Sequence, residues 1–128
     1  MSLKDNLRVM IVDDMSTSRG ILMNTLYEIG IKHVDFSRDG KEALDKLAGN
    51  PAHLIVSDYN MPGLDGLQLL KAIRENKMTS KCGFILVTGT ESAEVVKEGM
   101  ALGMNNYLKK PFNAESLAKC ITQVVGPL

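Results

Sequence analysis

The residues best suited to chemistry are three aspartates, a threonine and a lysine, each at the end of a short apolar segment. These residues are Asp13 and Asp14 after 8–12, Asp58 after 53–57, Thr88 after 84–87, and Lys110 after 106–109. Carboxylates brought together repel by about 4 kcal/mol per pair at ~4 Å and an effective dielectric of about 20. A hard divalent cation relieves that repulsion. Mg²⁺ takes such oxygen ligands, typically one or two carboxylates together with a phosphate.

The remaining groups suit a phosphoryl oxygen. Lys110 offers a compact positive charge and Thr88 offers a hydroxyl donor. An aspartate carboxylate can be the nucleophile and form an aspartyl phosphate, as we expect for Asp58. Catalysis would then consist mostly of positioning and charge neutralisation.

A structural interpretation of the same residues stays open at this point. Asp58 and Thr88 can simply end their strands, because aspartate in particular is common where a strand meets a loop. The pair Asp13-Asp14 can favour the start of a helix through the helix dipole. The distribution of these groups over the fold has to decide between the two interpretations.

The chain alternates strand-like and helix-like segments five times. The predicted strands are 8–12, 33–37, 53–57, 84–87 and 106–109. The predicted helices begin at the hydroxyls of 16–18, at Asp39, at Asp65 or Gly66, at Ser92 and at Asn113. Segments 8–12, 53–57 and 84–87 are continuously apolar, which is typical of parallel strands covered on both faces.

This pattern predicts an α/β fold, a three-layer doubly wound (βα)5 sandwich. Right-handed crossovers favour a five-stranded parallel sheet in the flavodoxin-like order 2-1-3-4-5. Ligands of such sheets bind beyond the carboxyl ends of the strands, where the strand order reverses. We therefore expect one site at that edge, formed by Asp13, Asp14, Asp58, Thr88 and Lys110.

Composition narrows the class of protein. The 128 residues are 45% hydrophobic and 23% charged with zero formal net charge, so we expect one domain over 1–128 and no nucleic-acid or membrane partner. No apolar run approaches the ~18 residues of a membrane span, and the polar start lacks a signal core. Cys82 and Cys120 lack metal-ligand spacing. We expect a monomeric, cytoplasmic protein with reduced thiols.

Together these motifs resemble the receiver domain of bacterial two-component response regulators, and are similar to the single-domain, CheY-like chemotaxis regulators. The resemblance covers essentially the whole chain. It rests on Val12-Asp13-Asp14, the run from Ser57 to Gly66, Val87-Thr88-Gly89, Tyr107 and Lys110-Pro111-Phe112.

The resemblance implies that Asp58 accepts a phosphoryl group from a histidine kinase. It implies that Asp14, Asp58 and the Asn60 main-chain carbonyl hold Mg²⁺, with Asp13 acting mainly through water. The residues that would bind phosphoryl oxygens are Thr88, Gly89, Lys110 and Asn60. Lys110-Pro111 would be a cis peptide bond, a form that only X-Pro bonds adopt cheaply.

The resemblance also implies a signalling switch that catalyses only its own phosphorylation and autodephosphorylation. Tyr107 would change rotamer as Thr88 is drawn to the phosphoryl group, although a tyrosine in a strand is more often a half-buried sheet residue. The output face would comprise the helix at 92–102, the strand at 106–109 and the last helix. Its partner in chemotaxis would be a flagellar motor switch protein or a phosphatase. A phosphorelay intermediate or a phosphate sink remains an alternative.

The sequence departs from the well-studied chemotaxis regulator at three places. Thr90 stands where that protein has an acid and Tyr59 where it has tryptophan, so the lifetime of the phosphoryl group is left open. The fourth helix begins Glu91-Ser92-Ala93-Glu94 rather than with lysines, which leaves the motor partner open.

Two other classes are weaker alternatives. A flavodoxin-like cofactor module would use the hydroxyls of 16–18 for phosphate, but the aspartates before them would repel it. A haloacid-dehalogenase-type phosphatase would need a second aspartate two residues after its nucleophile. Asn60 stands at that position.

Overall fold

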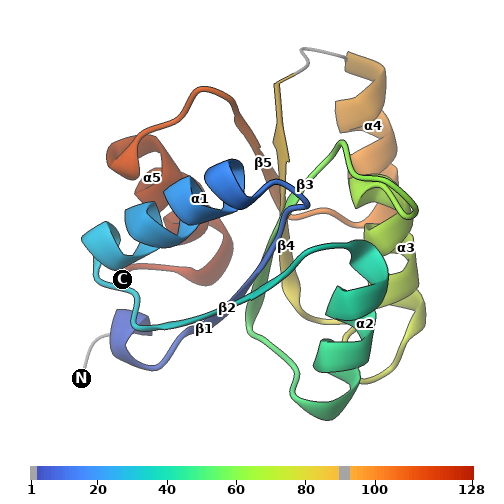
Figure 1. Ribbon diagram of the computed structural model, residues 1–128, viewed down its shortest axis with the longest axis horizontal. Helices are drawn as coiled ribbons and strands as arrows, with labels where there is room; N and C mark the ends of the chain where they lie inside the picture. Colours follow the sequence, from blue (N-terminus) through green and yellow to red (C-terminus); the bar gives the residue numbers. More distant parts are fainter. Residues whose placement is uncertain (1–2, 90–92) are drawn as a thin grey trace.

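The computed structural model describes residues 3–89 and 93–128, so Thr90, Glu91 and Ser92 lie outside the described residues (Figure 1). The strands are β1 (Arg8–Val12), β2 (His33–Ser37), β3 (Leu54–Asp58), β4 (Gly83–Thr88) and β5 (Asn106–Lys109). The helices are the 3-10 turn η1 (Leu3–Asp5), α1 (Ser16–Ile29), α2 (Gly40–Gly49), α3 (Gly66–Glu75), α4 (Ala93–Leu102) and α5 (Ala114–Val125). No helix in these ranges is long and apolar enough to cross a membrane.

The strands form one parallel sheet in the order β2-β1-β3-β4-β5, which confirms the predicted topology. Helices α1 and α5 cover one face and α2, α3 and α4 cover the other (Figure 1). Val12 pairs with Ser57, and Asp58 pairs with Val87. Because of this register, the carboxyl ends of β1, β3 and β4 lie side by side along one end of the sheet.

Alternate residues of the central strands supply two separate cores, because successive side chains of a strand point to opposite faces. In β1, Val9 and Ile11 join the core under α1 and α5, whereas Met10 and Val12 join the core under α2 and α3. The residues of β3 are all buried, while β2 and β5 at the edges are partly exposed. The continuous apolar runs thus reflect burial on both faces.

Side-chain caps fix where three of the helices begin. Asp39, Asp65 and Asn113 each accept a main-chain N–H of the first turn, as predicted. The predicted hydroxyl cap of α1 is wrong, because Met15 is the N-cap and makes no side-chain cap bond. The Met15 N–H itself donates to Asp13 Oδ1 at 3.0 Å, which links the start of α1 to the carboxylate of the preceding loop.

Gly66 allows α3 to begin directly against the end of β3. A Cβ at this position would lie 2.6 Å from the Asp58 carbonyl oxygen and 2.6 Å from Leu86 Cδ1. The Gly66 N–H also donates to the Tyr59 carbonyl at 2.9 Å. A larger residue would therefore push α3 away from Asp58.

Both cysteines are buried and free. The Cys82 thiol donates to the Ala52 carbonyl at 3.0 Å and the Cys120 thiol donates to the Tyr107 carbonyl at 3.6 Å. Burial raises the pKa of both thiols, that of Cys120 to about 11.

Candidate functional site

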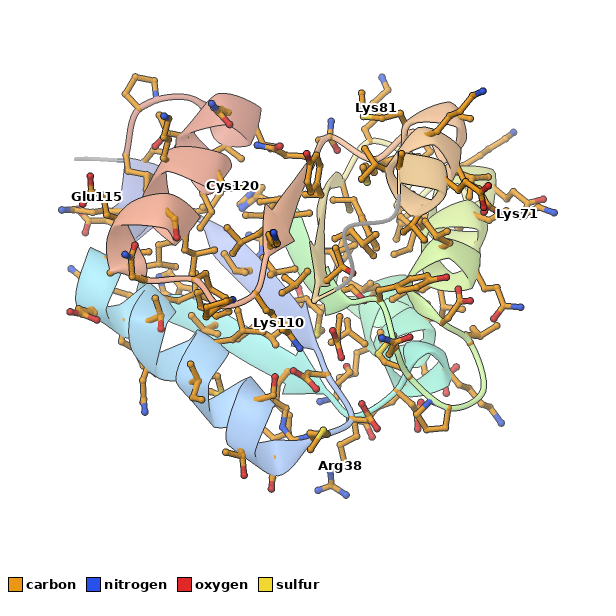
Figure 2. All side chains as sticks on the ribbon, turned by 90° about the horizontal axis from the view of Figure 1, so that it is seen from above. Arg38, Lys71, Lys81, Lys110, Glu115 and Cys120 are labelled. Carbon is orange, nitrogen blue, oxygen red and sulfur yellow. The ribbon has the colours of Figure 1, made fainter. Side chains whose placement is uncertain are left out.

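Asp58 is the last residue of β3, one residue further into the strand than its predicted position after 53–57. Its side chain is buried, and Lys110 Nζ donates to Asp58 Oδ1 at 3.1 Å. Lys110 follows β5, and its N–H donates to the Thr88 carbonyl at 2.9 Å. Figure 2 views this face from above and shows Lys110 pointing towards its centre.

Asp13 and Asp14 follow β1 and complete an acidic cluster with Asp58. One carboxylate oxygen from each of the three lies within 4.8 Å of the others. Asp13 is fully buried and Asp14 is exposed. Asp13 Oδ1 accepts the Met15 N–H, whereas Asp13 Oδ2 is buried without a hydrogen-bond partner.

This donor set fits a small divalent cation. A buried carboxylate oxygen without a partner costs free energy, and so does the mutual repulsion of three carboxylates. Mg²⁺ prefers oxygen ligands, and an exposed carboxylate such as Asp14 leaves room for the waters that Mg²⁺ retains. The acidic cluster therefore matches the chemistry of Mg²⁺.

Burial raises the pKa of the Asp58 carboxyl above its usual value, and the charge of Asp13 raises it further. The hydrogen bond and charge of Lys110 oppose this shift. Lys110 thus favours the ionised form of this buried carboxylate. A bound cation would act in the same direction as Lys110.

The other predicted phosphoryl-binding residues lie around the same edge of the sheet. Thr88 is the buried last residue of β4, next to the end of β3. A Cβ at Gly89 would meet nothing within 4 Å, so the space beside its main chain is open. Asn60 is exposed in the loop after β3.

Two further predicted residues lie in or after β5. Tyr107 is 45% exposed on this edge strand, and among the described residues its side chain makes no hydrogen bond to the acidic cluster. The Lys110-Pro111 peptide bond is cis.

Two hollows flank the aspartate. One, of about 510 Å³, is mostly apolar and is lined by Met15, Thr17, Ser18, Ile21, Lys110, Pro111 and Phe112. The other, of about 470 Å³, is lined by Tyr59, Asn60, Met61, Pro62 and Asp65. α1 begins at Ser16, so the hydroxyls of 16–18 lie in its first turn, at the helix start predicted from the sequence.

Arg19 is a residue of this site that sequence reasoning missed. It lies on α1, and its Nη1 donates to the Asp13 main-chain carbonyl at 3.0 Å. Its guanidinium carbon lies 4.8 Å from the centroid of the Phe36 ring. The available signal was its position in the first turn of the helix that follows the two aspartates.

Comparison with known proteins supports one family. The profile of the response regulator receiver domain matches residues 9–122. A probable chemotaxis protein CheY of Rhizobium etli is 38% identical over 128 residues, covering 100% of this chain and 99% of the relative. Chemotaxis protein CheY-3 of Vibrio cholerae is 34% identical over 122 residues, covering 95% and 94%.

Solved structures support the same family. The chemotaxis protein CheY4 of Vibrio cholerae superposes with a TM-score of 0.87 at 34% identity, covering 93% of this chain and 98% of that one. The parallel sheet therefore has the architecture of a solved protein that matches 93% of the chain. The chain belongs to the response regulator receiver domain family and is similar to its CheY chemotaxis members, which are components of two-component signalling.

Proposed function

We propose that this chain accepts a phosphoryl group on Asp58 from the phosphohistidine of a histidine kinase. The observation that carries the proposal is the buried Asp58 carboxylate, which is paired with Lys110 at 3.1 Å and lies within 4.8 Å of Asp13 and Asp14. Among the described residues, Asp58 is the one member of the acidic cluster that pairs with an ammonium group.

The transfer is a single displacement. A carboxylate oxygen of Asp58 attacks phosphorus, the bond from phosphorus to the imidazole nitrogen breaks, and its electron pair stays on the imidazole. The product is an acyl phosphate on Asp58 and a free histidine on the donor. Lys110 stabilises the charge on the transferred oxygens and loses part of its bond to Asp58.

The residues around Asp58 divide into two groups. Asp13, Asp14, Asp58 and the Asn60 carbonyl would hold Mg²⁺, which neutralises negative charge on the phosphoryl oxygens when bound. Thr88, Gly89, Lys110 and Asn60 would contact the phosphoryl oxygens. One hollow is lined by Lys110, the hydrogen-bond partner of Asp58, and the other by Tyr59, the next residue in the chain.

The output is a conformational switch. Phosphorylation adds charge and acceptor oxygens beside Thr88, and Thr88 ends the strand that leads towards α4. The movement of Thr88 would change the rotamer of Tyr107 and bias the face formed by α4, β5 and α5. In chemotaxis this face would bind a flagellar motor switch protein or a phosphatase in the cytoplasm. A relay intermediate or phosphate sink would use the same Asp58 chemistry with another partner.

The first test uses phosphoramidate, whose phosphorus–nitrogen bond mimics that of phosphohistidine. Wild type with Mg²⁺ should gain the mass of one phosphoryl group, and the gain should map to Asp58. The Asp58→Asn variant should gain none, while the control Asp45→Asn, at an exposed position of α2, should be labelled like wild type. A phosphoryl group that persists on Asp58→Asn would overturn the assignment.

The second test separates chemistry from output. Lys110→Ala should retain some labelling but lose the NMR shift changes in α4 and β5 that the beryllofluoride adduct of wild type produces. Unchanged α4 shifts in wild type on forming the adduct would contradict the switch. Capture of a motor protein, or of a second phosphotransfer protein, by that adduct identifies the output.

A further inference from the structure

Arg19 holds the main chain of the loop that carries the first two aspartates. Its Nη1 donates to the Asp13 carbonyl at 3.0 Å, across the turn from β1 into α1. Its guanidinium carbon lies 4.8 Å from the centroid of the Phe36 ring on β2, which suits a cation–π contact. The side chain thus connects α1, β2 and the Asp13 main chain.

Asp13 is fixed at three of its polar atoms. Its N–H donates to the Ser37 carbonyl at 3.1 Å, its carbonyl accepts from Arg19, and its Oδ1 accepts the Met15 N–H at 3.0 Å. The remaining atom, Oδ2, is buried without a partner. The contacts of Asp13 therefore leave one carboxylate oxygen for a ligand of the cluster.

The phenyl ring of Phe36 is itself held in place. Lys46 Nζ lies 5.2 Å from its centroid and also donates to the Phe36 carbonyl. The ring is thus a platform for Arg19 that does not depend on the cluster. Arg19 makes no ion pair with an aspartate of the cluster among the described residues, so its guanidinium does not compete for the carboxylates.

We propose that Arg19 is a positioning residue for the divalent cation, which rests on the metal binding in the proposed function. Arg19, braced by Phe36, fixes the Asp13 main chain, so that Asp13 and Asp14 present their carboxylates in binding geometry before the cation arrives. Groups that orient metal ligands without touching the metal typically affect its affinity by about 10- to 100-fold.

The charge of Arg19 makes this proposal sharply testable. If Arg19 acted only through its charge, its removal would reduce repulsion of the cation and tighten binding. If Arg19 positions Asp13, its removal weakens binding. The two roles therefore predict opposite signs for one substitution.

The experiment measures Mg²⁺ binding to the metal-free full chain by titration calorimetry. Arg19→Gln should bind Mg²⁺ about tenfold more weakly than wild type, as expected for loss of an orienting group. Arg19→Lys keeps the charge but lacks the planar fork, so it should restore little of the affinity. Phe36→Leu keeps Arg19 and should weaken binding in the same direction by a smaller factor.

Arg38→Gln is the matched control. Arg38 follows β2, is exposed and points outwards at the rim of the view in Figure 2, and its main-chain N–H donates to Glu42 Oε1 at 3.2 Å. Removing its charge should leave Mg²⁺ affinity unchanged or slightly raise it. Equal or tighter Mg²⁺ binding by Arg19→Gln would overturn the positioning role.

A second measurement excludes a merely structural effect. In phosphoramidate labelling, Arg19→Gln should need more Mg²⁺ for half-maximal rate yet reach the wild-type rate at saturation. General destabilisation would lower the saturated rate without moving the midpoint, and that result would also overturn the proposal. If Arg19→Gln does not fold, Phe36→Leu carries the same test. A wild type that binds no Mg²⁺ would instead contradict the proposed function.

Discussion

Two partly buried cationic side chains, Lys110 and Arg74, hold loops at opposite ends of the strands, and they differ in the groups that they bind. Lys110, at the carboxyl ends of the strands, contacts the Asp58 carboxylate at 3.1 Å. Arg74, near the end of α3, lies at the amino ends of β4 and β5. Arg74 makes five hydrogen bonds, to the carbonyls of Ser80 and Cys82, twice to that of Gly103, and to Asn105 Oδ1.

The difference lies in how each contact responds to a change of charge. The acceptors of Arg74 are neutral and stay acceptors whatever happens at Asp58. Asp58, the partner of Lys110, would change its charge and shape under the proposed phosphorylation. Arg74 holds the Gly103 turn after α4. We therefore expect the proposed response of α4 to phosphorylation at its other end.

The largest expected effect is on stability when the Arg74 contacts are removed. Arg74→Met leaves several carbonyls without a donor and should lower the free energy of unfolding by about 3 kcal/mol. Urea unfolding measures this, with Lys71→Met at an exposed position of the same helix as the control. Mg²⁺-dependent labelling of Asp58 should stay at the wild-type rate. A loss of labelling in folded Arg74→Met would show that the two edges are not independent.

A second change tests crowding at the Asp58 edge. Gly66→Ala places a methyl group 2.6 Å from the Asp58 carbonyl and should cost about 2 kcal/mol of stability. Gly20→Ala is the matched control, because nothing lies within 4 Å of its Cβ in α1. That control should be neutral or stabilise by up to about 1 kcal/mol. Equal effects of the two substitutions would show that α3 does not need this close approach.

The stabilisation by Mg²⁺ should be independent of the contacts of Arg74 and dependent on the acidic cluster. At ten times its dissociation constant, Mg²⁺ should stabilise wild type by about 1.4 kcal/mol. The same increment should appear in Arg74→Met, because distant sites add. It should be largely lost in Asp13→Asn, which removes a ligand charge. Thermal unfolding with Mg²⁺ or with EDTA measures each increment, and an increment that disappears in Arg74→Met would contradict the separation.

The smallest expected effect is a pH-dependent gain in Asp58→Asn without metal. Burial raises the folded-state pKa of Asp58, so the folded protein binds this proton more tightly than the unfolded chain does. Wild type therefore loses stability as pH rises from about 3.9, the ordinary aspartate pKa, through the raised folded value. Above that window Asp58→Asn should be more stable than wild type. The gain should stay under about 1 kcal/mol, because the substitution also removes the charged partner of Lys110. Below about pH 3.9 the gain should vanish.

Local patterns in the sequence were sufficient to predict the layers of the fold and most of the site's location. The continuous apolar runs gave the buried parallel strands, and caps such as Asp39 and Asn113 gave helix starts. The cap of α1 was mispredicted because the helix begins at Ser16, so that Met15, which has no hydroxyl, is its N-cap residue. The roles of Arg19 and Arg74 were not predicted because both bind main-chain carbonyls. Every residue has a carbonyl, so the sequence does not mark which ones serve as partners. Gly103, for example, whose carbonyl accepts from Arg74, lies 29 positions from it.

The two buried thiols have a practical consequence for watching this protein move. Alkylating reagents react with the thiolate, and burial keeps Cys82 and Cys120 protonated and shielded at neutral pH. A single introduced cysteine on the surface would therefore be the site that a maleimide dye labels. Met100→Cys, on the exposed side of α4, would let fluorescence follow that helix without first replacing either native cysteine.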